Sequence, residues 1–175
     1  MIFQDPGDSL NDRANIDYIV SEGLRAYHLY ENEEDRLNKV SEMLEKVGLR
    51  SEYLSRYPHE FSGGQRQAVT LLMATLKTPK LLLLDEHTAA LDPKTAKIVL
   101  DITDQVVTEN KLTTLMITHN MADAIKHGNR LIMMHEGRVV VDVSGEAKKN
   151  LTVEQLLNLF TQASGGMVSD RLILG

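Results

Sequence analysis

The sequence contains no cysteine and no tryptophan, and only 5% of its residues are aromatic. Without cysteine, disulfide scaffolds, cysteine–zinc sites and thiol catalysis are excluded. Apolar runs such as residues 81–84 and 131–134 fall far short of the roughly 20 residues that a membrane-spanning helix needs. The chain has 19 basic and 25 acidic residues, a net charge of −6, which argues against a nucleic-acid partner.

The remaining composition is that of an ordinary globular chain. The 175 residues are 42% hydrophobic and 25% charged, enough for one domain or two small subdomains. Residues 1–6 lack the basic region and the long apolar core of a signal peptide.

The N-terminal third is predicted to be helical. Apolar residues recur at helical spacing over 16–27 and 37–47, and Gly48 is suited to end the second helix. The acidic run 31–35 lies at the start of that helix, where it interacts favourably with the helix dipole. Pro58 then breaks the chain.

From Phe61 onward the pattern alternates helix and strand. Helices are predicted over 63–76 and from Asp92, with an apolar stripe of Ile98, Ile102 and Val106, and a short helix after Asn120. Strands are predicted over 81–84 and 113–118, the first buried on both faces because it is continuously apolar. This alternation indicates an α/β fold with a parallel sheet. Two strands at 130–135 and 138–143 and a helix over 152–163 follow.

Ser62, Gly63, Gly64 and Gln65 form the first candidate site. Ser62 and Gln65 have the spacing of a capping box, and a helix N-terminus with a hydroxyl and two glycines can bind an anion. Taken alone, the motif is more simply an ordinary helix cap.

Asp85 and Glu86 form the second candidate site, at the end of a predicted strand. An aspartate there can bind Mg²⁺, and a neighbouring glutamate can orient or deprotonate a water molecule. The alternative is a pair of solvated acids. His119 ends the next strand, so we expect it at the same sheet edge. Asp92 is accounted for as an N-cap, and Gln4 carries no signal of its own.

Together these segments resemble the ATP-binding subunit of an ABC transporter. In the family's order, residues 3–6 resemble the Q-loop, 61–65 the signature motif, 81–86 Walker B with its catalytic glutamate, and 90–92 the D-loop, while His119 resembles the switch histidine. The resemblance implies an incomplete P-loop NTPase-like sheet with an all-helical subdomain. It also implies four zones: 1–7, the end of the Q-loop strand; 8–60, the helical subdomain; 61–128, the catalytic core; and 129–175, the C-terminal part.

The resemblance also implies roles for these residues. Asp85 and Gln4 would bind Mg²⁺, Gln4 would also couple the site to a transmembrane partner, Glu86 would polarise the attacking water, and His119 would contact the γ-phosphate of ATP. The signature residues Ser62, Gly63, Gly64 and Gln65 would contact ATP held mainly by a second ATP-binding subunit, and Asp92 would communicate across that dimer. The implied location is the cytoplasmic face of the bacterial plasma membrane, beside transmembrane permease subunits.

The sequence also departs from the family pattern. None of its eleven glycines is followed by lysine, so the phosphate-binding loop G-x-x-x-x-G-K-[ST] is absent from these residues. His87 stands where the family usually has proline, which we interpret as a loop variation that leaves Glu86 intact. Residues 1–67 resemble subunits of oligopeptide and dipeptide importers, and the rest resembles another bacterial, amino-acid-type import branch. The chain is either a mosaic of two members or one divergent protein.

Three functional hypotheses follow. In the first, the chain is part of an importer ATPase and is inactive by itself because the phosphate-binding loop is missing. The second is a non-catalytic truncated subunit that docks on a permease or an intact ATPase. The third, a soluble family member in translation or DNA repair, fits the charge of −6 and the import-type helical zone less well. An exposed sheet edge leads us to expect marginal stability and self-association.

Overall fold

The computed structural model describes residues 10–163 of the chain. It divides into two compact units, Met1–Ile117 and Thr118–Gly175, and each combines helices with a two-stranded sheet. This confirms the predicted α/β class, whereas the four zones remain a prediction. Over the described residues, no helix has both the length and the apolar character needed to cross a membrane.

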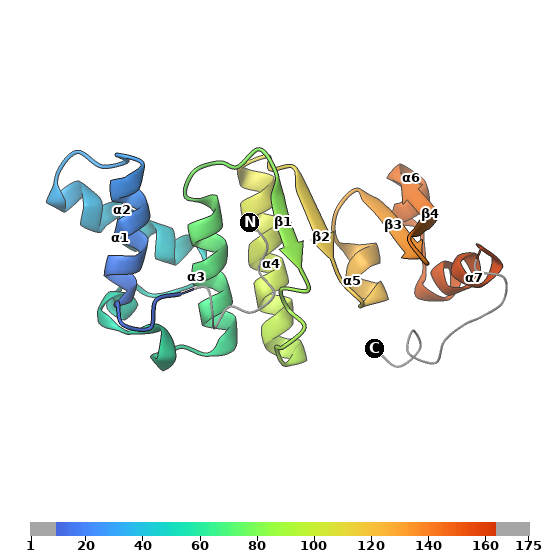
Figure 1. Cartoon of the computed structure of the whole chain (residues 1–175), viewed down its shortest axis with the longest axis horizontal. Helices are drawn as coiled ribbons and strands as arrows, with labels where there is room; N and C mark the ends of the chain where they lie inside the picture. The colour runs from blue at the N-terminus through green and yellow to red at the C-terminus, as the bar shows by residue number, and fades with distance from the viewer. Residues whose placement is uncertain (1–9, 164–175) are drawn as a thin grey trace. The chain divides into compact units, whose positions relative to one another are not determined.

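The first unit begins with helices and continues with a helix–strand alternation (Figure 1). The helices predicted before Pro58 and after Phe61 are confirmed, and Pro58 opens a short 3-10 helix. In chain order the elements are α1 (Ile16–Ala26), α2 (Glu33–Lys46), η1 (Ser51–Ser55), η2 (Pro58–Glu60), α3 (Gly63–Thr75), β1 (Leu82–Asp85), α4 (Pro93–Glu109) and β2 (Thr114–Ile117).

The first two helices each begin after an asparagine N-cap, which the apolar spacing alone does not predict. The Asn15 side chain accepts a hydrogen bond from the Tyr18 N–H at 2.9 Å, and the Asn32 side chain accepts one from the Asp35 N–H at 2.9 Å. Each bond satisfies one of the N–H groups that a helix start leaves without a partner. At the other end of α2, Gly48 has a φ of 73°, the left-handed conformation of a helix stop.

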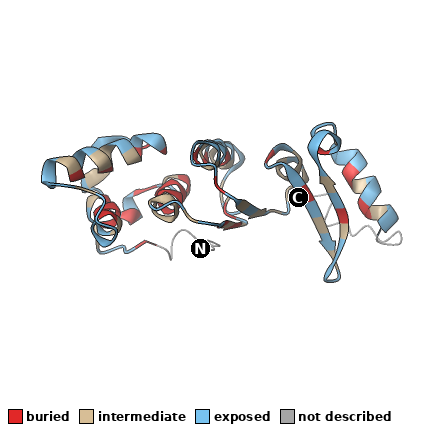
Figure 2. Cartoon of the chain, turned by 90° about the horizontal axis from the view of Figure 1, so that it is seen from above, coloured by how far each residue is buried: buried red, intermediate tan, exposed pale blue. Residues whose placement is uncertain are grey.

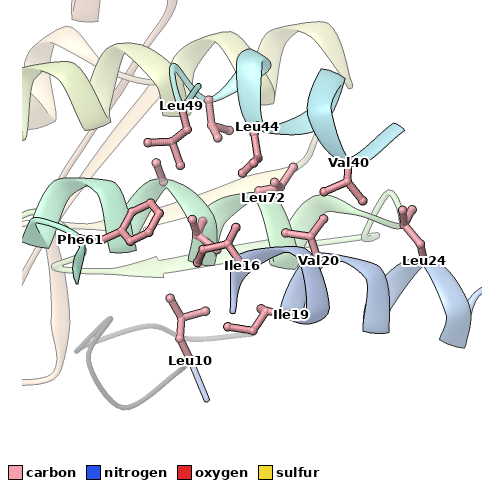
Figure 3. Packing of buried hydrophobic residues seen from close by; sticks show 13 residues of the cluster. Leu10, Ile16, Ile19, Val20, Leu24, Val40, Leu44, Leu49, Phe61 and Leu72 are labelled. Carbon is pink, nitrogen blue, oxygen red and sulfur yellow. The ribbon is translucent and has the colours of Figure 1, made fainter. Parts of the chain in front are cut away.

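The core of the helical part lies where three helices meet. Val20 and Leu24 of α1, Val40 and Leu44 of α2, and Leu72 of α3 point toward one another (Figure 3). Figure 2 shows the same division, with buried residues on the packed faces of the helices and exposed residues on their outer faces. Each such side chain contributes about 1.5–3 kcal/mol on burial, so this cluster is the main source of stability for the helical part.

A buried arginine links α1 to α2. Arg36 is only 4% exposed, and its guanidinium lies 2.6 Å from Asp17 Oδ1 and 2.6 Å from Glu33 Oε1. It also donates a hydrogen bond to the Ser21 hydroxyl. The hydrogen bond from Arg36 is the main reason that the pKa of Glu33 lies below its usual value. The charge buried between the two helices is therefore compensated.

The sheet of the first unit is parallel, as predicted, with Leu82 paired to Thr114 and Asp85 to Ile117. The expectation that its first strand is buried on both faces is wrong. Leu82 and Leu84 are buried against α3 and α4, but Leu83 on the opposite face is only partly buried, and Leu115, its partner on β2, is about half exposed. Side chains alternate across a pleated strand, and helices cover only one side of this one.

The predicted stripe of α4 is also partly wrong. Ile98 is 53% exposed, whereas the buried face consists of Val99, Leu100, Thr103 and Val106. Thr103 belongs to this face because its hydroxyl has partners inside the protein, donating to the Val99 carbonyl oxygen at 2.8 Å. A stripe chosen by hydrophobicity alone passes over such a residue.

Up to residue 163, where the description ends, the second unit consists of a hairpin and three helices. Its hairpin turns at Glu136 and Gly137, whose φ values of 48° and 76° are those of a two-residue type I′ turn. Buried Lys148 donates to the carbonyl oxygens of Ile125 and His127, at the end of the first helix of this unit. The elements are α5 (Met121–Lys126), β3 (Arg130–His135), β4 (Arg138–Ser144), α6 (Gly145–Lys149), which was not predicted, and α7 (Val153–Ala163).

Candidate functional site

The N-terminus of α3 has the capping box that the sequence predicts. The Ser62 hydroxyl accepts a hydrogen bond from the Gln65 N–H at 3.3 Å, and the Gln65 side chain accepts one from the Ser62 N–H at 3.0 Å. Ser62 is exposed at the surface. The helix start is thus rigidly capped and accessible, and its positive dipole end favours an anionic ligand.

The two glycines of this motif allow another part of the same chain to approach closely. A Cβ added at Gly64 would lie 2.2 Å from Thr95 Cγ2, and one added at Gly63 would lie 3.0 Å from Leu91 Cδ2. Both neighbours lie at or just before the start of α4. The glycines therefore have a packing function within the protein, in addition to any contact with a ligand.

Asp92 is the N-cap of α4, as predicted. Its side chain accepts a hydrogen bond from the Thr95 N–H at 3.1 Å. Hydrogen bonds from Thr95, first through its side chain and then through its backbone, hold the pKa of Asp92 below the usual range, so the carboxylate stays charged. The structure thus brings the signature-like and D-loop-like segments together at one place.

Asp85 and Glu86 lie at the carboxyl end of β1. Asp85 is the last residue of the strand, because its pairing with Ile117 continues the ladder by one residue beyond the predicted end. Glu86 donates its backbone N–H to the Ile117 carbonyl oxygen at 2.9 Å and has a φ of 45°. The chain therefore leaves the sheet abruptly at Glu86, in a left-handed conformation that L residues seldom adopt.

His87 is a residue whose role sequence reasoning missed. Its side chain is 5% exposed, and its Nε2 lies 3.2 Å from Thr103 Oγ1. The available signal was a threonine inside an otherwise apolar face of α4. A buried polar side chain of this kind needs an internal partner.

Two predicted site residues are not placed beside the others. His119 follows Ile117 by two residues but belongs to the second unit, so its proximity to Glu86 stays a prediction. Gln4 lies outside the described residues.

Asp85, at the end of β1, is the described residue that the family resemblance assigns to Mg²⁺. Asp85 is half-buried there, a hard oxygen donor of the type that Mg²⁺ prefers. No group of three or more His, Asp or Glu side chains suited to a metal occurs within residues 10–163. Mg²⁺ is usually held by one or two carboxylates together with substrate phosphates, so this donor set fits a nucleotide-bound ion.

Comparison with protein families gives a match that includes these features. The family model described as "ABC transporter" matches residues 1–89, about half of the chain, including the signature-like motif and the Asp85–Glu86 pair.

Similar curated proteins bear transporter names. The chain is 44% identical over 167 residues to a tyrosine transport ATP-binding protein of Clostridioides difficile, covering 93% of this chain and 66% of that protein. It is 44% identical over 144 residues to an oligopeptide transport ATP-binding protein, OppF, of Streptococcus pyogenes, covering 82% of this chain and 47% of that protein. The match to the tyrosine protein crosses the junction near Gln67 that the sequence suggested. The chain thus spans about half to two thirds of the length of these relatives.

Solved structures agree on the fold. CbiO1 from Clostridium perfringens, part of the ABC transporter complex cbiONQ, is 25% identical with a TM-score of 0.72, covering 92% of this chain and 62% of that one. A dimeric ATP-binding cassette in a post-hydrolysis state, bound to ADP and Pi, is 26% identical with a TM-score of 0.65, covering 82% and 62%. The capped α3 start, the carboxylates after β1 and these matches establish that the chain belongs to the ABC transporter family, among ATP-binding subunits with the α/β fold of ABC ATPases.

Proposed function

We propose that this chain is part of the ATP-binding subunit of an ABC importer that couples ATP hydrolysis to the uptake of peptides or a related small solute. The observation that carries the proposal is the exposed, capped start of α3 packed against the start of α4. Relatives named for oligopeptide and tyrosine transport support the solute class. The partners proposed are transmembrane permease subunits and a second ATP-binding subunit, at the cytoplasmic face of the bacterial plasma membrane.

The proposal gives the described site residues the following tasks in ATP hydrolysis. Ser62, Gly63 and Gly64 contact the γ-phosphate of ATP held mainly by the second subunit, using the N–H groups and dipole of the helix start, and Gln65 belongs to the same nucleotide-binding segment. Asp92 transmits the state of that contact across the dimer. Glu86 orients the water that attacks the γ-phosphate, and His119 contacts that phosphate. Phosphoryl transfer is governed by such positioning and by charge stabilisation.

The metal is assigned to Asp85 and, outside the described residues, to Gln4. When bound, Mg²⁺ neutralises phosphate charge. Asp85 places its carboxylate at the end of β1, and its pairing with Ile117 fixes its backbone there.

The chain by itself is proposed to be inactive. The phosphate-binding loop absent from these residues supplies several charge-assisted hydrogen bonds, each worth about 1.5–3 kcal/mol. Losing three of them weakens ATP binding by roughly three orders of magnitude or more. ATP turnover by the pure chain that Glu86→Gln abolishes would contradict this.

The second candidate function is a non-catalytic subunit that docks on a permease or an intact ATPase, and the exposed, capped start of α3 is a surface that such a partner could contact. One titration distinguishes three cases: a shared ATP site, docking without catalysis, and no binding. The chain is added to an intact, related ATP-binding subunit while its ATP hydrolysis is measured.

Stimulation that requires Ser62 supports the shared ATP site. Inhibition, or binding without any change in hydrolysis, supports docking alone. Ser62→Arg places a bulky cation at the α3 start and should abolish stimulation, whereas Ser51→Arg makes the same change at another exposed serine and should not. If neither binding nor a change in rate occurs, both candidate functions fail.

A further inference from the structure

The backbone at Glu86 requires an explanation beyond its position after β1. Its φ of 45° lies in the left-handed region, which a residue with a Cβ avoids unless neighbouring structure enforces it. Two backbone hydrogen bonds hold this residue: its N–H donates to the Ile117 carbonyl oxygen at 2.9 Å, and its carbonyl oxygen accepts from the Ala89 N–H at 2.9 Å. Both bonds act on the backbone of Glu86 itself and on the turn that it begins.

The next residue supplies a third restraint. His87 is buried, and its Nε2 lies 3.2 Å from Thr103 Oγ1 in the middle of α4. The hydroxyl of Thr103 donates its one proton to the Val99 carbonyl oxygen at 2.8 Å. Thr103 can therefore only accept from the imidazole, so Nε2 of His87 carries a proton. The chain of bonds ends on the backbone of α4, a rigid element.

The loop between β1 and α4 is thus attached to α4 at two places. His87 is bonded to Thr103 near the loop's first residue, and Asp92 is bonded to the Thr95 N–H at its last. The attachment at Asp92 is an ordinary helix cap. The bond from His87 does not cap a helix, and His87 is the residue directly after Glu86.

We propose that His87 is a positioning residue for Glu86: by bonding to Thr103 it keeps Glu86 in its left-handed backbone conformation and so sets the direction of the carboxylate. The role assigned to the carboxylate rests on the proposed function, but the positioning itself does not. A histidine that anchors the loop through its side chain restrains this segment differently from the proline that the family usually carries, which acts through its ring.

Nuclear magnetic resonance of the whole chain tests this without any nucleotide. We expect the ring nitrogens of His87 to show the tautomer protonated at Nε2. Thr103→Val, nearly isosteric but unable to accept the bond, should shift the Glu86 Cα and Cβ resonances toward those of extended backbone. Thr103→Ser retains the hydroxyl and should leave them in place. A merely structural role for His87 predicts changes in stability with the Glu86 resonances unmoved.

Thr70→Val is the matched control. Thr70 is 1% exposed, and its hydroxyl has no hydrogen-bond partner within the described part of the chain, so this change removes a buried hydroxyl elsewhere in the same unit. It should not move the Glu86 resonances. If Thr103→Val does not fold, His87→Gln, which retains an N–H donor, and His87→Leu, which does not, give the same comparison.

The proposal is overturned by a His87 whose Nε2 carries no proton, or by Glu86 resonances that stay in place in Thr103→Val and in His87→Leu. These readouts need neither ATP nor a partner subunit. A failed titration with an intact ATPase would therefore reject the proposed function while leaving the positioning of Glu86 to be judged on its own.

Discussion

Gly64 lies at a contact between α3 and α4 where a side chain has no room. Because an added Cβ would lie 2.2 Å from Thr95 Cγ2, Gly64→Ala must push the two helices apart. We expect a loss of about 1–3 kcal/mol in the free energy of unfolding, the usual effect of overpacking. Urea denaturation measures it.

Gly63→Ala is the comparison at the neighbouring position. Its added Cβ would meet only the flexible end of Leu91 at 3.0 Å, so it should cost less than Gly64→Ala. Thr95→Ser removes the obstructing methyl group but retains the hydroxyl, and combined with Gly64→Ala it should recover much of the loss. Equal stability of Gly64→Ala and the unchanged chain would contradict the close approach.

The thermal stability of the protein should fall at acid pH as Asp92 loses its charge. Its pKa is lowered by hydrogen bonds from Thr95, so it contributes stability above the unfolded value, 3.8, and this contribution is lost as pH falls through the lowered folded pKa. Asp92→Asn still caps the helix but carries no charge. The difference in melting temperature between the two proteins should therefore shrink on acidification, as followed by circular dichroism.

A difference that stays constant from neutral pH down to below the folded pKa would mean that the charge of Asp92 is not involved.

At the scale of elements, α1 and α2 are joined by the buried Arg36 as well as by apolar packing. Arg36→Met should lower the free energy of unfolding by about 1–2 kcal/mol, because Asp17 loses a charged hydrogen-bond partner. The value stays below that of a fully buried ion pair because the Asp17 side chain is 30% exposed. Chemical denaturation checks this.

Arg50 provides the control for that change. Its ion pair with Glu52 joins two exposed side chains, at 75% and 60%, so Arg50→Met should have almost no effect on unfolding. If the two variants are equally stable, Arg36 does not join the helices energetically.

The elements also show how far sequence patterns reach. The helices and strands other than α6 were located from apolar spacing and from caps such as Ser62, Asp92 and Asn120, because these signals act within a few residues of the chain. The buried face of α4 was misassigned at Ile98, and Thr103 was passed over. Which side of a helix is buried depends on its neighbours, and those come from elsewhere in the sequence.

At the scale of the whole molecule, the sheet of the first unit leaves apolar side chains exposed. Leu81, Leu115 and Ile117 are 46%, 52% and 50% exposed. We expect the chain to self-associate with rising concentration, because open strands and apolar surface favour such contacts. Sedimentation velocity over a range of concentrations tests this.

Threonine is β-branched and suits a strand, so replacing both Leu115 and Ile117 by threonine should preserve β2. The double replacement should weaken the association because it removes exposed apolar surface. Leu37→Thr changes a leucine of similar exposure, 42%, on α2 and should not. A chain that stays monomeric at every concentration would contradict the expectation.

The sequence by itself determined the family, the α/β class and the candidate residues, because motif order and helix caps are local properties of the chain. Only the tertiary structure decided what Gly63, Gly64 and His87 do. Gly64 makes room for Thr95, and His87 bonds to Thr103, sixteen residues away. Such roles depend on which atoms folding brings together, and close packing makes each contact specific to its partner.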